Sequence, residues 1–190
     1  MLILASTSRY RRELLERLRL PFEIAAPHVD ESPLALETPP ERAQRLALAK
    51  ASAVSRKHPA ATVIGSDQVA VCKGEVLEKP AGIERCRAQL RWLSASAATF
   101  FTAVAILNAT RHTSTELIDT TTVYFRTLST QEIERYVAVE QPFDCAGGFR
   151  VEALGITLFA RVVSEDPTAL IGLPLIGLAR ALRQLGYQLP

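Results

Sequence analysis

Val63-Ile64-Gly65-Ser66-Asp67-Gln68-Val69-Ala70-Val71 is the segment around which the rest of the chain is organised. Its valines and isoleucine predict a buried strand, yet a buried strand should not carry an unpaired carboxylate. Gly65 and Ser66 leave room on one side of Asp67 for something larger than a side chain. The alternative is an aspartate in a tight turn that bonds its own backbone. Residues elsewhere in the chain bear on this choice.

The composition is that of an ordinary globular chain. Of its 190 residues, 48% are hydrophobic and 22% are charged, which predicts a single domain over residues 1–190 that buries about 70% of its unfolded surface. The net charge of +2 comes without a long basic run, so neither a nucleic acid nor a membrane is expected as a partner. Three cysteines without metal-like spacing, and no apolar run of membrane-spanning length, favour a cytoplasmic location.

Strand and helix patterns alternate along the chain and predict an α/β fold. Strands are expected at residues 2–5, 21–26, 63–71, 76–77, 99–107, 115–126 and 156–163. Helices are expected from residue 9, over 40–57 and 83–93, from a capping box at 129–132 to before Pro142, and from residue 175.

A lysine interrupts the apolar stripe of the helix expected over 40–57. At about 100° per residue, one arc of this helix is apolar, formed by Ala43, Leu46, Ala47, Ala53 and Val54. Lys50 falls in the middle of that arc. A lysine there either extends its ammonium group to the surface or meets a fixed negative partner. Lys50 and Asp67 are therefore the two strongest indications of a functional site.

The start of the helix at residue 9 offers a place for an anion. Strand 2–5 runs into Ser6-Thr7-Ser8, where free backbone N–H groups and the helix dipole both favour negative charge. Ser6 or Ser8 can cap the helix. Arg11 is a candidate phosphate contact, whereas Arg9 and Arg12 are expected to be solvated.

Two more charged residues are candidates. Glu31 follows Asp30 in a loop; such acids are either solvated or form a hard-cation site if the fold brings them near Asp67. Lys79 stands between a strand and a helix, where it is either a second phosphate-facing cation or an ordinary surface lysine.

These carboxylates and cations are typical of cleavage at phosphorus with a divalent metal, in which positioning and electrostatic stabilisation dominate. Asp67 alone is a poor base at neutral pH, so it needs metal assistance or desolvation. A thiol mechanism at Cys145 is disfavoured, because no histidine stands in a structured position to activate it.

The chain resembles the Maf family of nucleotide pyrophosphatases from Leu2 to about Leu185. The matching motifs are Leu4-Ala5-Ser6-Thr7-Ser8 with Arg11, Glu31, Leu46-Ala47 with Lys50-Ala51, Gly65-Ser66-Asp67, Gly74-Glu75 with Lys79-Pro80, Ala146-Gly147 and Gly172-Leu173-Pro174-Leu175. The resemblance implies an inosine-triphosphatase-like fold: a mixed, strongly twisted sheet flanked by helices, with two lobes and a central cleft.

The same resemblance implies hydrolysis of the α–β phosphate bond of a nucleoside triphosphate to the monophosphate and pyrophosphate. It makes Asp67 the proton acceptor and implies a divalent cation, Mg²⁺ or Mn²⁺, held by Glu31 and Asp67. It implies phosphate binding by Ser6, Arg11, Lys50 and Lys79. It also suggests a homodimer.

Three positions resemble the branch of the family that hydrolyses 7-methyl-GTP. They are Tyr10, Gln68 and Glu152, where the dTTP- and UTP-hydrolysing branch has Arg, Thr and Gln. Tyr10 offers an aromatic face to a positively charged methylated guanine, and Glu152 can accept hydrogen bonds from its N–H groups. Gln68 supplies amide contacts. Arg9 is a departure, because the family usually has proline there.

Two alternatives remain open at this point. The chain could be a dTTP and UTP pyrophosphatase of the same family, or a nucleotide-binding regulator of cell division without turnover. The second is disfavoured because Glu31, Lys50, Asp67 and Lys79 are all retained.

Overall fold

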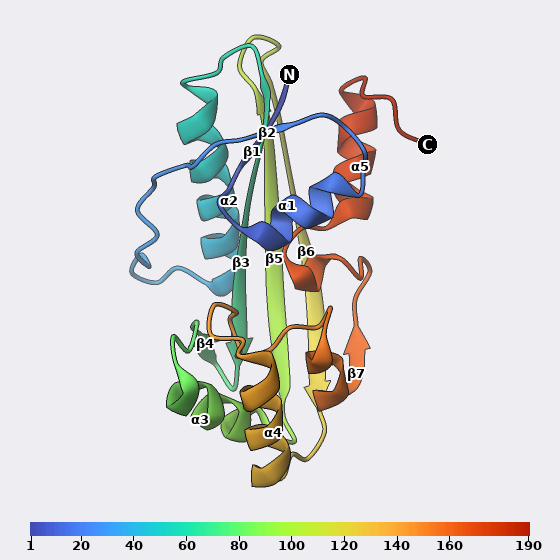
Figure 1. Cartoon of the computed structure of the whole chain (residues 1–190). Coiled ribbons are helices and arrows are strands. Elements are labelled where there is room, and N and C mark those ends of the chain that lie inside the picture. Colours follow the sequence, from blue (N-terminus) through green and yellow to red (C-terminus); the bar gives the residue numbers. More distant parts are fainter. The chain divides into compact units, whose positions relative to one another are not determined.

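The computed structural model describes residues 1–190. Figure 1 shows the elements, which are β1 (Leu2–Ala5), α1 (Arg9–Glu16), β2 (Glu23–Ile24), α2 (Pro39–Ser55), β3 (Thr62–Cys72), β4 (Glu75–Leu77), α3 (Ile83–Leu93), β5 (Ala97–Asn108), β6 (Thr113–Phe125), α4 (Thr130–Glu140), the 3₁₀ helix η1 (Leu154–Leu158), β7 (Phe159–Val163), the 3₁₀ helix η2 (Ala169–Ile171) and α5 (Leu175–Gln184).

The strands form one mixed sheet in the order β2-β1-β3-β5-β6-β7, with β4 also paired to β3. β1 is parallel to β2 and β3, whereas β4 and β7 pair in the antiparallel sense. The predicted mixed α/β class is therefore confirmed. The chain divides into two compact units, one of residues 1–68, 101–119 and 166–190 and one of residues 69–100 and 120–165. The single domain over 1–190 and the central cleft stay predictions.

The core of the first unit packs β1 and β3 against α1 and α5. Its buried side chains are Leu2, Leu4, Leu14, Leu15, Ile64, Val104, Ile106, Leu173, Leu178, Ala181 and Leu182. Successive side chains of a strand point to opposite faces of the sheet. Ile64 therefore faces this core, whereas the next residue, Gly65, faces α2, where Ala47 and Ala51 lie against it.

The second unit has its own aromatic core. Rings of Phe100, Phe125, Phe149 and Phe159 meet edge to face, with centroids 5.0 to 5.6 Å apart. This is the geometry that aromatic pairs favour, because the positive edge of one ring meets the negative face of another. Phe149 follows two glycines, Gly147 and Gly148, whose positive φ angles of 84° and 69° reverse the chain before it.

Most element expectations are confirmed, and two differ. Residues 21–26 contribute only the two-residue strand β2. Residues 156–163 were expected as one strand, but the segment from Leu154 to Leu158 is a 3₁₀ helix, in which Gly155 comes so close to the carbonyl of Arg150 that a Cβ would lie 2.2 Å from its oxygen. Asp67 lies inside β3, so the tight-turn alternative for it is wrong.

The capping box at the start of α4 makes acid stability depend on one carboxyl group. The Ser129 backbone N–H and hydroxyl each donate to Glu132 at 2.8 Å, and Arg126 pairs with it at 2.8 Å. These bonds, those from Ser129 foremost, lower the pKa of Glu132 from 4.5 to about 2. A lowered folded-state pKa contributes stability that is fully present above pH 4.5 and is lost as the pH falls toward about 2.

We therefore expect Glu132→Gln protein to have a lower free energy of unfolding than the unaltered protein at pH 7. The difference should shrink as the pH falls through the window from 4.5 to about 2. Urea denaturation at neutral pH and near the acid end of this window measures it. A difference that stays constant with pH would contradict the assignment.

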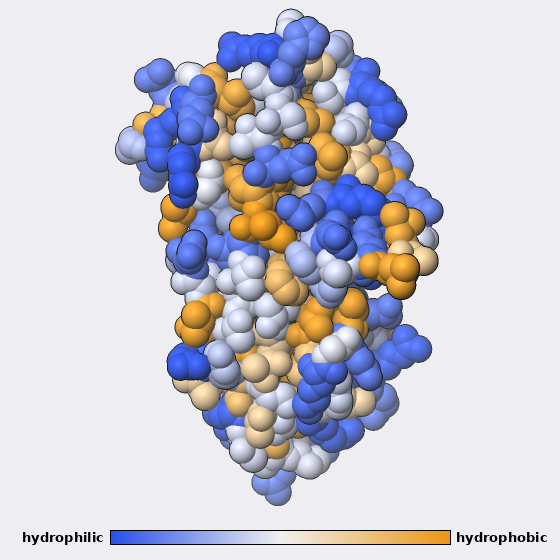
Figure 2. Space-filling view, turned by 180° about the vertical axis from the view of Figure 1, so that it is seen from behind, coloured by the Kyte–Doolittle hydropathy of each residue, from blue (hydrophilic) through white to orange (hydrophobic).

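On the face shown in Figure 2, hydrophilic side chains are mixed with small groups of apolar ones. Exposed large apolar residues such as Leu36 and Val139 belong to different elements and loops. None of the helices is both long enough and apolar enough to span a membrane.

Candidate active site

Lys50 and Asp67 meet inside the first unit, as the anomaly in the helix pattern predicted. The Lys50 ammonium nitrogen lies 2.6 Å from Asp67 Oδ1 and 2.7 Å from Glu31 Oε1. The side chains of Lys50 and Asp67 are only 7% and 10% exposed, whereas that of Glu31 is 56% exposed. A buried ammonium group is thus neutralised by one buried and one accessible carboxylate. Such an arrangement satisfies the requirement that buried charges be paired.

Gly65 allows this contact by letting a helix backbone approach the strand. A Cβ at Gly65 would lie 2.2 Å from the carbonyl oxygen of Ala47 and 2.6 Å from the backbone nitrogen of Ala51, both in α2. Asp67 is two residues further along β3 and points to the same face. Lys50 precedes Ala51 in α2, so the close approach at Gly65 places its amine beside the carboxyl group of Asp67.

The turn between β1 and α1 lies beside this part of β3 and contains two serines with defined roles. β1 ends at Ala5, which is paired with Gly65, so the turn that starts at Ser6 and leads into α1 leaves the sheet beside this part of β3. Ser6 is buried and its hydroxyl accepts from the N–H of Ser8 at 3.1 Å, while Ser8 caps the helix. From the sequence, either Ser6 or Ser8 could have been the cap.

Arg11 is held by the segment that precedes α5. Its Nε donates to the carbonyl of Gly172 at 3.0 Å. Burial lowers the pKa of Arg11, and the negative charges of Asp67 and Glu31 act in the opposite direction. The guanidinium group therefore lies within the electrostatic reach of both carboxylates. The two remaining nitrogens of its guanidinium group are suited to binding an anion. Phosphate binding by Arg11 stays a prediction.

Ser66 and Gln68 are sequence neighbours of Asp67 but face the other side of β3. The Ser66 hydroxyl donates to the Gly172 carbonyl at 3.1 Å. The Gln68 amide nitrogen donates to Thr102 Oγ1 and to the carbonyls of Ala169 and Leu170 at 2.9, 3.0 and 3.2 Å. This nitrogen is therefore committed to the protein. The contribution of Gln68 to substrate specificity stays a prediction. It would act through the amide oxygen of Gln68 or through the position of the 169–172 segment.

Asp166 and Thr168, which were not predicted as site residues, hold the 169–172 segment. Asp166 is buried, and it accepts from the Thr168 backbone and hydroxyl at 2.9 and 2.6 Å and from the N–H of Ile176 at 2.6 Å. The Thr168 hydroxyl also accepts from the N–H of Leu175 at 2.8 Å. Asp and Thr shortly before the expected helix at 175 are residue types that cap helices, which was the available signal.

The guanidinium group of Arg9 packs on the ring of Tyr10. The Arg9 guanidinium carbon lies 4.7 Å from the centroid of the Tyr10 ring, and Arg9 Nη2 donates to the Tyr10 hydroxyl at 2.6 Å. One face of the aromatic ring is thus already occupied by a cation from the same chain. Arg9 was expected to be solvated; it is exposed, but it also packs on its neighbour.

Lys79 and Glu152 belong to the second unit, and both are exposed. Glu152 lies in the turn between Arg150 and η1, which Glu140 holds by pairing with Arg150 at 2.7 Å and by accepting from the N–H of Leu154 at 3.1 Å. Cys145 is a free thiol that donates to Asp144 Oδ1 at 3.5 Å. The predicted roles of Lys79 and Glu152 stay predictions.

Glu31 and Asp67 could hold a divalent cation only if substrate phosphates supply further oxygen ligands. Glu31 and Asp67 converge on a single nitrogen, so their oxygens can converge on one cation. No group of three or more His, Cys, Asp or Glu side chains gathers to form a closed metal cage. Mg²⁺ is commonly held by one or two carboxylates together with substrate phosphates. The donor set is consistent with that mode of binding.

Comparison with known proteins gives a consistent result. A family model described as "Maf-like protein" matches residues 1–185. A 7-methyl-GTP pyrophosphatase of Aromatoleum aromaticum is 54% identical over 190 residues, covering 100% of this chain and 97% of the relative. Another, from Xanthomonas campestris pv. campestris, is 53% identical over 189 residues, covering 100% and 98%. A solved HAM1 protein from Coxiella burnetii aligns with 65% of this chain and 72% of its own, at 18% identity and a TM-score of 0.43.

Proposed function

The chain belongs to the Maf family, and from this membership we infer that it is a nucleotide pyrophosphatase. The reaction is hydrolysis of a nucleoside triphosphate between its α and β phosphates, which gives the monophosphate and pyrophosphate. The names of the relatives support 7-methyl-GTP, or a related modified purine triphosphate, as the substrate. The observation that carries the proposal is the buried Lys50 ammonium group between Asp67 and the accessible Glu31.

In this reaction, Asp67 accepts a proton from the water molecule whose oxygen attacks the α phosphorus. The bond from that phosphorus to the bridging oxygen breaks, and pyrophosphate leaves with the bond's electrons. We propose that the positive charges of Lys50 and Arg11 stabilise the charge that develops on the phosphate oxygens. A divalent cation, which Glu31 and Asp67 would hold when it is bound, would supply positive charge to the phosphates and help to activate water. Ser6 and Lys79 are proposed as further phosphate contacts.

The direct test uses purified protein, Mg²⁺ and a panel of 7-methyl-GTP, GTP, dTTP and UTP. We expect pyrophosphate and the monophosphate in equal amounts, with the highest kcat/KM for 7-methyl-GTP. Release of orthophosphate instead would place the cleavage at another bond. Faster turnover of dTTP and UTP would favour the pyrimidine alternative, and no turnover of any nucleotide would contradict the proposal.

Tyr10, Gln68 and Glu152 are proposed to set base specificity. A methylated guanine is positively charged, which favours an aromatic face and a carboxylate in its site. Arg9 lies on the Tyr10 ring and thus competes for the same interaction. Its removal should favour a cationic base over a neutral one.

We expect Arg9→Ala protein to prefer 7-methyl-GTP over GTP more strongly than the unaltered protein. A cation–π contact at an exposed site is worth about 0.5–1 kcal/mol, so the ratio of the two kcat/KM values should rise about two- to fivefold. Arg12→Ala is the matched control, because Arg12 lies in the same helical turn but pairs with Glu16 at 2.8 Å. An equal ratio in both variants would show that Tyr10 does not stack on the base.

We also propose that the protein is a cytoplasmic homodimer. The homodimer rests on the family resemblance alone. The location is supported by three cysteines that are all free.

A further inference from the structure

Glu31 lies on a loop that has no regular structure of its own. The chain between β2 and α2 contains neither helix nor strand from residue 25 to residue 38. A carboxylate on such a loop needs external contacts if it is to remain in one position. The residues that make those contacts determine how well Glu31 meets Lys50.

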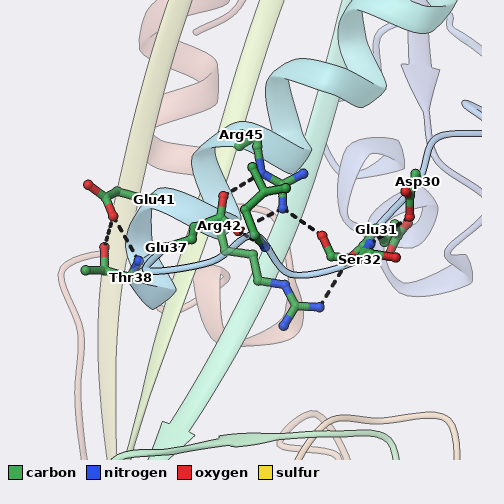
Figure 3. A network of polar contacts seen from close by, with 9 residues as sticks. Asp30, Glu31, Ser32, Glu37, Thr38, Glu41, Arg42 and Arg45 are labelled. Atoms are coloured by element: carbon green, nitrogen blue, oxygen red, sulfur yellow. Dashed lines mark hydrogen bonds and ion pairs between the residues drawn. The ribbon is translucent and has the colours of Figure 1, made fainter.

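Two arginines of α2 hold the loop by its backbone, as Figure 3 shows. Arg42 Nη2 donates to the carbonyl of Glu31 itself at 3.2 Å. Arg45 Nη2 donates to the carbonyl of the next residue, Ser32, at 3.1 Å. Successive carbonyl groups are therefore fixed to the same helix that carries Lys50.

Arg45 is itself held by a buried carboxylate. Its Nε and Nη2 donate to the two oxygens of Glu37 at 2.5 and 2.8 Å, and the Glu37 side chain is only 7% exposed. Glu37 also accepts from the N–H of Leu34 at 3.2 Å. The bidentate pair fixes the plane of the guanidinium group, which a lysine could not do. Hydrogen bonding to Arg45 lowers the pKa of Glu37, so the pair remains ionised at neutral pH.

We propose that Arg45, fixed by Glu37 and assisted by Arg42, is a positioning residue that holds Glu31 against Lys50 and so sets the affinity for the divalent cation. Arg45 acts through the loop, because its contacts are to Ser32 and Glu37. Lys50 and both arginines belong to α2, so the ammonium group and the Glu31 loop are positioned by one rigid element. This inference rests on the proposed function for its effect on catalysis, but not for its effect on the loop.

The test compares Arg45→Met with Arg56→Met in the full chain. Arg56 is at the end of the same helix, and its side chain donates only within that helix, to the carbonyl of Ser52 at 3.3 Å. We expect Arg45→Met to speed hydrogen exchange in residues 28–38. The Mg²⁺ concentration for half-maximal pyrophosphate release should rise about tenfold, the lower end of what loss of an outer contact to a metal ligand costs. kcat at saturating Mg²⁺ should remain close to that of the unaltered protein, and Arg56→Met should change neither quantity.

A further variant separates geometry from charge. Arg45→Lys keeps the charge but loses the bidentate geometry, so we expect it to behave as Arg45→Met. Full recovery by lysine would overturn the inference, and so would unchanged exchange in residues 28–38 of the methionine variant. Faster exchange with an unaltered Mg²⁺ requirement would overturn the link to the cation. If the unaltered protein releases no pyrophosphate, the proposed function fails, while the exchange measurement still decides whether Arg45 holds the loop.

Discussion

Replacing Asp67 with asparagine is expected to lower kcat for pyrophosphate release about 10²–10⁴-fold, the range that a general base contributes. The asparagine oxygen can still accept from the Lys50 ammonium group, which lies 2.6 Å from Asp67 Oδ1. It cannot take a proton from water. Glu31 remains as a charged partner for Lys50, so the variant should stay folded. Rapid-quench measurement of a single turnover isolates this chemical step.

Asp30→Asn is the matched control for Asp67→Asn. Asp30 is exposed beside Glu31, and its carboxylate accepts from the N–H of Ser32 at 2.9 Å, a bond that asparagine can also accept. The same change of acid to amide should therefore leave kcat nearly unaltered. If both variants turn over at the rate of the unaltered protein, Asp67 is not the proton acceptor. Circular dichroism of both proteins checks that the loss does not come from unfolding.

A methyl group at Gly65 is expected to cost about 3 kcal/mol of the free energy of unfolding, at the upper end of what overpacking costs. The added Cβ would lie 2.2 and 2.6 Å from two backbone atoms of α2, and backbone atoms cannot rotate out of the way as a side chain can. The helix must therefore shift. For a chain of this size, the melting temperature should fall about 6–12 °C. Because α2 carries Lys50, activity should fall as well, even below the new melting temperature.

Gly82→Ala is the control for Gly65→Ala. Nothing lies within 4 Å of a Cβ at Gly82, and its φ of 175° is extended backbone that any residue adopts. We expect a loss of less than about 1 kcal/mol there, because Gly82 is the N-cap of α3, a position at which alanine is less favourable than glycine. Thermal denaturation of the two variants compares them directly. Equal melting temperatures would show that the contact between α2 and β3 tolerates a methyl group.

Local sequence patterns were sufficient for much of the secondary structure. The helix over 83–93 and the capping box at Ser129 occur where they were expected, because periodicity and caps act within a few residues. Residues 156–158 were predicted as the start of a strand, but they belong to the 3₁₀ helix η1. Their apolar character suits either state, and the close approach of Gly155 to Arg150 fixes them in a tight turn.

The site shows the same division. The position of Lys50 in an apolar arc indicated that its ammonium group either reaches the surface or meets a fixed negative partner, and the motifs identified Asp67 and Glu31 as candidates. No local pattern indicated that Gln68 would commit its amide nitrogen to the carbonyls of Ala169 and Leu170, about a hundred residues away. Nor did it indicate that Arg45 would hold the loop of Glu31.

By itself, the sequence determined the family, the order of most elements and the anomaly of a lysine within an apolar arc. These follow from patterns of a few residues and from the cost of leaving a charge unpaired in an apolar environment. Tertiary structure alone decided which face of β3 each neighbour of Asp67 uses and which arginines fix Glu31. Those choices depend on hydrogen bonds between segments distant in sequence, and no local pattern encodes their partners.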